Sequence, residues 1–105
     1  MLSALSIAVT GLNDAALRVA NATSNIVNAS STIKDGKNYQ GTSVVSSANA
    51  TSGVNSQIVP RTGNDGIDLA AELIDMTTAS YTYQANAKNI KVVSENQQRL
   101  LDTIA

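Results

Sequence analysis

The sequence predicts a mostly α-helical protein in which two long terminal helices pair as a coiled coil around a middle segment that holds a candidate β-hairpin. Three observations predict this fold. Apolar residues recur at alternating spacings of three and four at both ends of the chain. Between residues 30 and 66, twenty of 37 residues are Ser, Thr, Asn or Gly. Aromatic residues are only 3%, so the helices must pack through small side chains. A length of 105 residues supports a single rod-type domain, 1–105.

The first predicted helix covers residues 3–29. Ser3 is a plausible N-cap, and the helix ends among the Asn and Ser residues of 25–32, which compete for backbone hydrogen bonds. Its coiled-coil positions are spaced 4, 3, 4, 3, 4, 3: Leu5, Val9, Leu12, Ala16, Val19, Thr23 and Ile26.

The second predicted helix covers residues 68–104, with Asp68 as its N-cap. Glu72 and Asp75 share a face of its first turns, as a carboxylate pair for acid/base work or metal binding would. We interpret them instead as solvated residues that match the positive end of the helix dipole. The same spacing continues almost to the C-terminus through Leu69, Leu73, Met76, Ser80, Tyr83, Ala87, Ile90, Ser94, Gln97, Leu101 and Ile104.

The middle segment, 30–66, contains two short stretches with β-branched residues, 39–46 and 54–59. Residues 47–53 between them are mostly small and polar, so the pattern predicts a hairpin with a polar turn. A two-stranded hairpin is marginal alone, so we expect a helix or a neighbouring subunit beneath it.

Composition argues against most kinds of chemistry and several kinds of partner. The chain has no His and no Cys, which removes the commonest general base, the thiol nucleophile and the usual zinc ligands. We therefore expect no enzyme activity, no cofactor, no metal and no small-molecule substrate. The net charge is -1 without a basic cluster, which argues against nucleic acid. No apolar run is long enough for a transmembrane helix.

Two segments at each end of the chain resemble bacterial flagellar basal-body rod and hook proteins. Residues 3–13 (SALSIAVTGLN) and 19–30 (VANATSNIVNAS) are similar to the N-terminal segment of that family, which ends in a pattern of the type ASNIANAxT. Residues 67–76 (IDLAAELIDM) and 80–88 (SYTYQANAK) are similar to its C-terminal segment, which includes YQANAK. Both ends match in the order that the family shows. The short middle segment makes the chain most like a short proximal-rod subunit.

The resemblance implies a structural subunit that assembles through its terminal helices into an axial tube of the basal body. Implied partners are copies of itself, other flagellar axial proteins and the flagellar type III export apparatus. The implied location is the periplasm-spanning rod, reached without a cleaved signal peptide; no Lys or Arg precedes Arg18, so a positive n-region is missing. The alternative is a free-standing secreted helical-hairpin adaptor or a chaperone-like binding module.

The helix lengths also predict contacts with other chains. The second helix is about ten residues longer than the first, so one partner helix leaves roughly 15 Å uncovered. A second apolar line, through Ile74, Tyr81, Val93 and Leu100, lies beside the coiled-coil positions. The resemblance and the apolar spacing together predict a subunit interface that includes Leu5, Val9, Leu12, Ala16, Val19, Asn25, Ile26, Asn28, Leu73, Met76, Tyr83, Gln84, Asn86, Ala87, Ile90 and Leu101.

Overall fold

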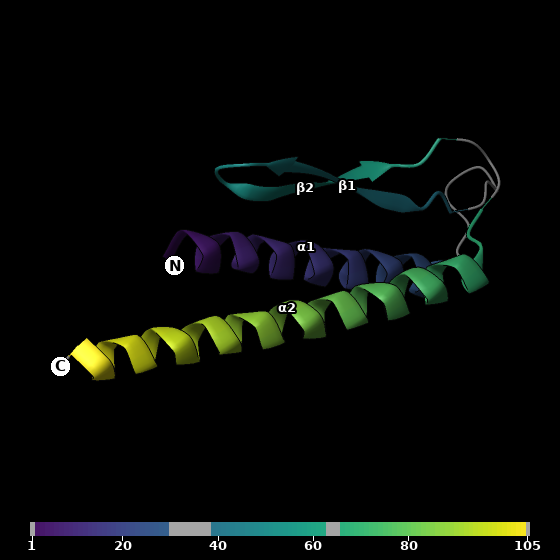
Figure 1. Ribbon diagram of the computed structural model, residues 1–105. Helices are drawn as coiled ribbons and strands as arrows, with labels where there is room; N and C mark the ends of the chain where they lie inside the picture. Colours follow the sequence, from purple (N-terminus) through teal and green to yellow (C-terminus); the bar gives the residue numbers. More distant parts are fainter. Residues whose placement is uncertain (1, 30–38, 63–65, 105) are drawn as a thin grey trace.

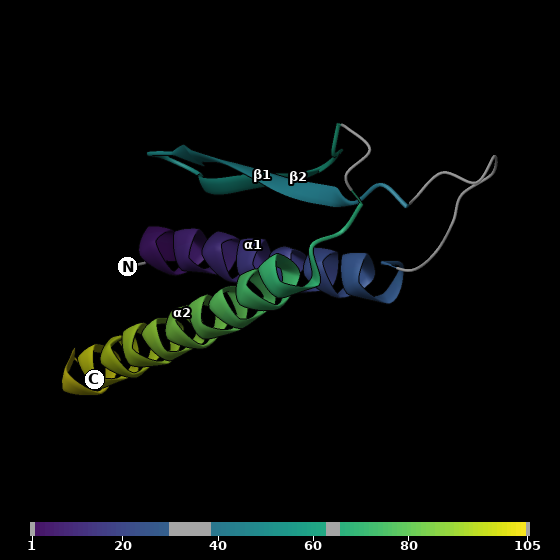
Figure 2. The same cartoon turned by 90° about the vertical axis from the view of Figure 1, so that its right-hand side faces the viewer.

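The computed structural model describes residues 2–29, 39–62 and 66–104. In chain order it contains helix α1 (Leu2–Val27), strands β1 (Thr42–Asn49) and β2 (Gly53–Pro60), and helix α2 (Leu69–Ile104). The helices lie side by side and run in opposite directions, and the β1–β2 hairpin covers α1 on the side away from α2 (Figures 1 and 2). The predicted mostly α fold with a hairpin is confirmed.

The ends of the helices follow local hydrogen bonding. Asp68 caps α2, because its Oδ1 accepts from the Ala71 amide at 3.2 Å. Ser3 is not the N-cap of α1, since the helix already begins at Leu2. At the other end of α1, the Asn28 side chain donates to the Ser24 carbonyl at 2.8 Å and so satisfies a carbonyl of the last turn.

The two helices pack in an antiparallel register, and at several predicted positions the residue in the contact is the one before the predicted residue. Gly11 lies against Asn86, whereas Asn25, later in α1, hydrogen-bonds to Glu72, earlier in α2. The two helices therefore run in opposite directions. The helix contact is formed by residues that are buried or half-buried. In α1 they are Leu5, Ala8, Leu12, Ala15, Val19, Ala22 and Ile26, and in α2 they are Glu72, Met76, Ala79, Ser80, Asn86, Ile90, Val93 and Gln97.

This register corrects part of the predicted coiled coil. Leu5, Leu12, Val19 and Ile26 are half-buried as predicted, but Val9, Ala16 and Thr23 are exposed. In α2, four predicted positions are half-buried: Met76, Ser80, Ile90 and Gln97. The other predicted positions of α2 are exposed: Leu69, Leu73, Tyr83, Ala87, Ser94, Leu101 and Ile104. The small side chains of Ala8, Ala15, Ala22 and Ala79 let the helix backbones approach closely, and at three of these positions the next residue is larger: Val9, Thr23 and Ser80.

The hairpin is antiparallel and pairs Thr42 with Pro60 through to Asn49 with Gly53. Its turn is shorter than predicted and consists of residues 50–52, because residues 47–49 belong to β1. The first strand begins at Thr42 rather than at residue 39. Asn49 Oδ1 accepts from the Thr51 amide at 2.9 Å, an Asx turn that closes the loop tightly.

Polar contacts fasten the hairpin to α1. Ser46 and Ser56, which face each other across the hairpin, both donate to Asp14 Oδ1. Arg18 donates to Asp14 Oδ2 at 3.0 Å and also to the Ser46 hydroxyl. Near the turn, the Val54 amide donates to Thr10 Oγ1 at 3.0 Å. The hairpin therefore has the helix beneath it that the sequence requires.

The apolar core is thin. Among the described residues, the buried apolar side chains are Ala15, Ala22 and Ala79, whereas the largest fully buried side chains are Glu72 and Asn25. Three alanines remove little apolar surface from water, so hydrogen bonds and an ion pair must position the elements.

Gly53 at the start of β2 provides a test of the close packing of the hairpin against α1. Its φ is +89°, and a Cβ at this position would meet Thr10 Oγ1 and the Ile7 backbone. We expect Gly53→Ala to lower the free energy of unfolding by more than about 1 kcal/mol, because it adds both backbone strain and a clash. Urea unfolding followed by circular dichroism measures it. Ser52→Ala, in the exposed turn, is the control and should stay within about 0.5 kcal/mol; equal losses in both variants would contradict the close approach.

Candidate assembly interface

A buried ion pair joins α2 to the segment that follows the hairpin. Glu72, in the first turn of α2, is 1% exposed. Its Oε1 lies 2.6 Å from Arg61 Nη2. Arg61 also donates from its amide to the Gly41 carbonyl and from Nε to the Ser43 hydroxyl, so its guanidinium is held in place by both strand ends.

Two asparagines of α1 complete this cluster. Asn25, fully buried, donates to Glu72 Oε1 at 3.2 Å and to the Thr42 carbonyl at 2.9 Å, and its Oδ1 accepts from the Thr42 amide at 3.0 Å. Asn21 donates to the same Thr42 carbonyl. We call Asn21, Asn25, Thr42, Arg61 and Glu72 the polar junction. It links α1, β1 and α2 at one point.

The structure overturns the prediction that Glu72 is a solvated residue of the first turn. Its carboxylate is buried because Arg61 and Asn25 supply a charge and a hydrogen bond that compensate for lost water. Its Oε2 has no hydrogen-bond partner among the described residues, which makes the Oε1 contacts all the more necessary. Asp75 is exposed, as the solvated interpretation requires.

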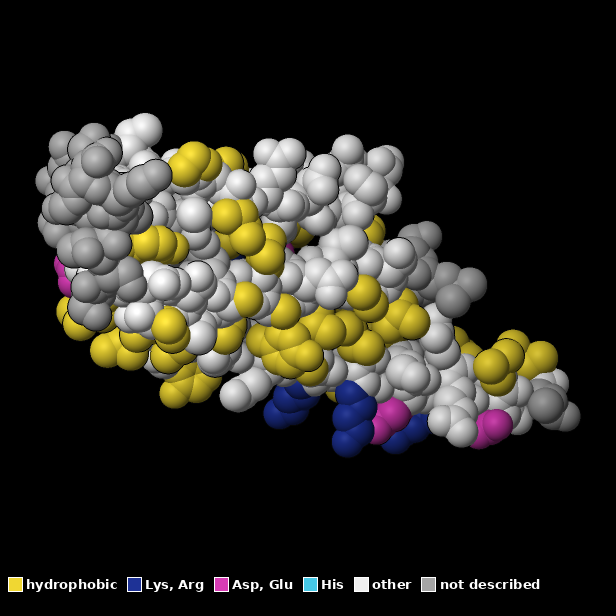
Figure 3. All heavy atoms as spheres, turned by 180° about the vertical axis from the view of Figure 1, so that it is seen from behind, with side chains coloured by type: hydrophobic (Ala, Val, Ile, Leu, Met, Phe, Trp, Pro, Cys, Tyr) yellow, Lys and Arg dark blue, Asp and Glu magenta, His cyan; other side chains and the backbone are white. Residues whose placement is uncertain are grey.

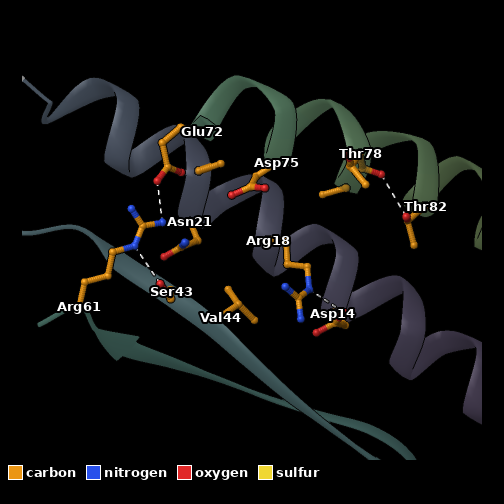
Figure 4. Close-up of a pocket in the computed structure, with 12 residues that line it drawn as sticks. Asp14, Arg18, Asn21, Ser43, Val44, Arg61, Glu72, Asp75, Thr78 and Thr82 are labelled. Carbon is orange, nitrogen blue, oxygen red and sulfur yellow. Dashed lines mark hydrogen bonds and ion pairs between the residues drawn. The ribbon is translucent and has the colours of Figure 1, made fainter. Parts of the chain in front are cut away.

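A polar cavity of 430 Å³ lies beside the junction, between α1, β1 and α2 (Figure 4). Two arginines line it, and each is paired with a carboxylate: Arg18 with Asp14, and Arg61 with Glu72. Across the described residues, no group of three or more Asp and Glu side chains is placed to hold a metal ion. Arg61 and Glu72 join the segment after β2 to α2, and Arg18 and Asp14 hold the hairpin on α1.

The pKa of Asp14 lies below its ordinary value. Partial burial by itself raises the pKa of this carboxyl, but hydrogen bonds from Ser46, Ser56 and Arg18, together with the positive charge of Arg18, outweigh that effect. The contact between α1 and the hairpin therefore favours the ionised carboxylate.

The residues predicted to form a subunit interface fall into three groups. Asn25 lies inside the polar junction, so its polar groups are already used within the chain. Half-buried members are Leu5, Leu12, Val19, Ile26, Asn28, Met76, Asn86 and Ile90. Exposed members are Val9, Ala16, Leu73, Tyr83, Gln84, Ala87 and Leu101. The last group is accessible to another chain.

Apolar side chains stay exposed along α2. Ile74, Tyr81 and Leu100, three of the four residues of the second apolar line, are 66%, 68% and 53% exposed, and Val93 is half-buried. Hydrophobic side chains form a band along the helices on the face seen in Figure 3, above an edge of charged side chains. A surface of this kind typically marks a protein–protein contact.

The C-terminal end of α2 extends beyond the N-terminus of α1 (Figure 1). The helices have 36 and 26 residues, so the excess predicted from the sequence is present. Leu101 and Ile104 in this end are 67% and 82% exposed. None of the described helices has the length and apolarity that crossing a membrane requires.

Sequence reasoning missed the polar groups that hold the elements together. Arg61 and Asp14 carry no motif, and their partners lie up to 42 positions away in the chain. One signal was available, since Ser46 and Ser56 lie at similar distances from the hairpin turn. That symmetry could have indicated that both serines face one acceptor.

An antiparallel helix pair with a thin core and a long exposed apolar surface is typical of helical proteins that pack against other chains. Residues 65–103 match the family described as flagellar basal body rod FlgEFG protein C-terminal. The C-terminal region of this chain is thus similar to that of the flagellar basal-body rod and hook family, which is structural and in general not enzymatic. This match supports the resemblance and indicates a structural role in the flagellar basal body. A comparison with curated proteins found no match.

Removing the Glu72 carboxylate tests the polar junction. We expect Glu72→Ala to lower the free energy of unfolding by about 3 kcal/mol, because the loss leaves Arg61 and Asn25 without their shared acceptor. This is the low end for a broken buried pair, since the Arg61 side chain is 33% exposed and can be solvated. Urea unfolding measures the loss. Asp75→Ala, three residues along α2, is the matched control and should change stability by no more than about 0.5 kcal/mol. Equal stability of the two variants would show that the junction is dispensable.

The lowered pKa of Asp14 predicts a pH dependence. A carboxyl whose pKa is depressed on folding contributes full stability above its unfolded pKa, about 3.9, and loses that contribution as pH falls through the folded pKa. The stability difference between wild type and Asp14→Asn should therefore be constant from about pH 7 to 5 and shrink below about pH 4. Thermal unfolding across this range measures it. A difference that grows on acidification would contradict the assignment.

Proposed function

We propose that this chain is a structural subunit of the flagellar basal-body rod that self-assembles through its terminal helices into an axial tube. The observation that carries the proposal is the combination of the family match over residues 65–103 with a helix, α2, whose apolar surface its own chain leaves largely uncovered. A subunit that polymerises needs exposed helical surface to contact its neighbours, whereas a monomer has no use for such a surface.

Its partners on this proposal are copies of itself and other axial proteins of the rod and hook. The subunit is exported by the flagellar type III apparatus without a cleaved signal peptide and resides in the periplasm-spanning rod. The short segment between the helices supports a position in the proximal rod. The fold is held by a few polar contacts rather than by a large core. It is therefore compatible with passage through an export channel, because few interactions have to be broken to unfold it.

The alternative is a free-standing secreted adaptor or chaperone-like module that uses the same exposed surface to bind a different protein. The two functions differ in solution. A rod subunit forms open-ended oligomers whose size grows with concentration, whereas an adaptor stays monomeric or closes into a small, fixed assembly. Sedimentation velocity over a concentration series separates them.

A charge on the exposed face of α2 tests the role of the helices. Leu73 is 49% exposed, so Leu73→Asp should leave the subunit folded but place a carboxylate in the interface between subunits. In cells whose motility depends on this subunit, we expect the variant protein to be made and swimming to be lost. A swimming assay and immunoblotting measure both.

The control is Ser47→Asp, an exposed position of the hairpin, which should leave swimming nearly intact. Normal swimming with Leu73→Asp and loss of swimming with Ser47→Asp would reverse the roles given to α2 and the hairpin.

A further inference from the structure

The α1–α2 pair has two sides, and the described part of this chain covers only one of them. On the first side, the polar cavity is closed by the hairpin through Ser43 and Val44 of β1. On the second side, a hollow of 270 Å³ between the helices is lined by Ala16, Val19, Ser80, Tyr83 and Gln84. None of these five residues is charged, and no residue of the hairpin lines the hollow.

Residues on both helices extend the line of this hollow, and we call the hollow together with this line the apolar groove. Residues at intervals of seven share a helix face, which places Val9 and Thr23 in line with Ala16, and Leu73 and Ala87 in line with Ser80. All of these coiled-coil positions are exposed except Ser80, which is half-buried. The heptad pattern therefore encodes two contact lines in each helix, one within the chain and one beside it.

The C-terminal end of α2 is the complementary surface. It extends past α1, and its apolar residues Leu100, Leu101 and Ile104 are 53%, 67% and 82% exposed. Leu101 and Ile104 continue the same alternating spacing as Leu73 and Ser80. It is a helix end with an apolar face and without a partner helix.

The groove and this helix end cannot meet within one chain. Leu101 follows Tyr83 by 18 residues on the same helix, a separation of about 27 Å. A second copy has no such constraint, and each copy offers one groove and one helix end. When copies join in series, the helix end of each copy covers the groove of the next.

We propose that the apolar groove between α1 and α2, opposite the hairpin, receives the C-terminal end of α2 from a second copy of this chain. The contact is heterologous, because the groove of one copy takes the helix end of the next, so it continues as an open series. The proposal rests on the proposed function as a self-assembling subunit and names the surfaces that make one of its contacts.

Disulfide cross-linking tests the contact directly, because the chain has no Cys of its own. A chain carrying both Ala16→Cys and Leu101→Cys cannot form the bond internally at this separation. At a concentration where sedimentation shows self-association, mild oxidation should yield a ladder of multimers on a non-reducing gel, and a reductant should collapse it. A mixture of the two single variants should stop at dimers.

Two further variants make the result specific. Gln84→Cys with Leu101→Cys uses the other wall of the groove and should give a ladder as well. Ala50→Cys with Leu101→Cys uses the exposed hairpin turn and should not. Circular dichroism at 222 nm verifies that each variant keeps its helices.

The outcomes separate this proposal from the proposed function. Suppose that wild type self-associates, but the two variants with a Cys in the groove do not cross-link, or cross-link no faster than the variant with a Cys in the hairpin turn. The groove then does not bind the end of α2 from another copy. If wild type stays monomeric at every concentration, the self-assembling subunit fails, and the groove contact fails with it.

Discussion

Glu72 places a buried carboxylate at the start of α2, and the arrangement of the other elements depends on how that carboxylate is satisfied. Arg61 reaches it from the end of β2, and Asn25 reaches it from the last turns of α1. Asn25 also binds both backbone groups of Thr42 at the start of β1. Because an uncompensated buried carboxylate is costly, α1, the two ends of the hairpin and α2 have to come together at one place. The three buried alanines only permit the close approach that these contacts require.

This arrangement divides the helix pair into a polar side and an apolar side. Asp14, Arg18 and the junction use the polar side to hold the hairpin, so the subunit gains its own shape without a large core. On the apolar side, Ala16, Tyr83 and the end of α2 are exposed, and the proposed contacts between subunits would use this surface. Polar contacts are directional and fix geometry, whereas apolar surface adds affinity wherever it is covered. The division suits a subunit that must be folded in one way and then joined to others.

The sequence was sufficient to predict features that depend on local pattern. The alternating spacing predicted both helices to within two residues at their ends, and the β-branched stretches predicted the hairpin. The same spacing was wrong at every second coiled-coil position of α1 and at most of those in α2. At Ala8 and Val9, for example, both residues are apolar, and only the partner helix decides which one is buried. Glu72 was misread for a related reason. Its burial depends on Asn25, 47 positions earlier, and a partner at such a distance leaves no periodic trace in the sequence.

The amide of Thr42 offers the most direct measurement of the central claim. Thr42 pairs with Pro60 at the open end of a two-stranded hairpin, where backbone amides ordinarily exchange quickly, but its N–H donates to the buried Asn25 side chain at 3.0 Å. If the polar junction holds the fold together, hydrogen exchange measured by NMR should find this amide among the slowest in the chain. It should exchange at a rate close to that of the α1 amides around Asn25. Exchange of Thr42 as fast as that of exposed amides in the hairpin turn, with the helices still protected, would contradict the account.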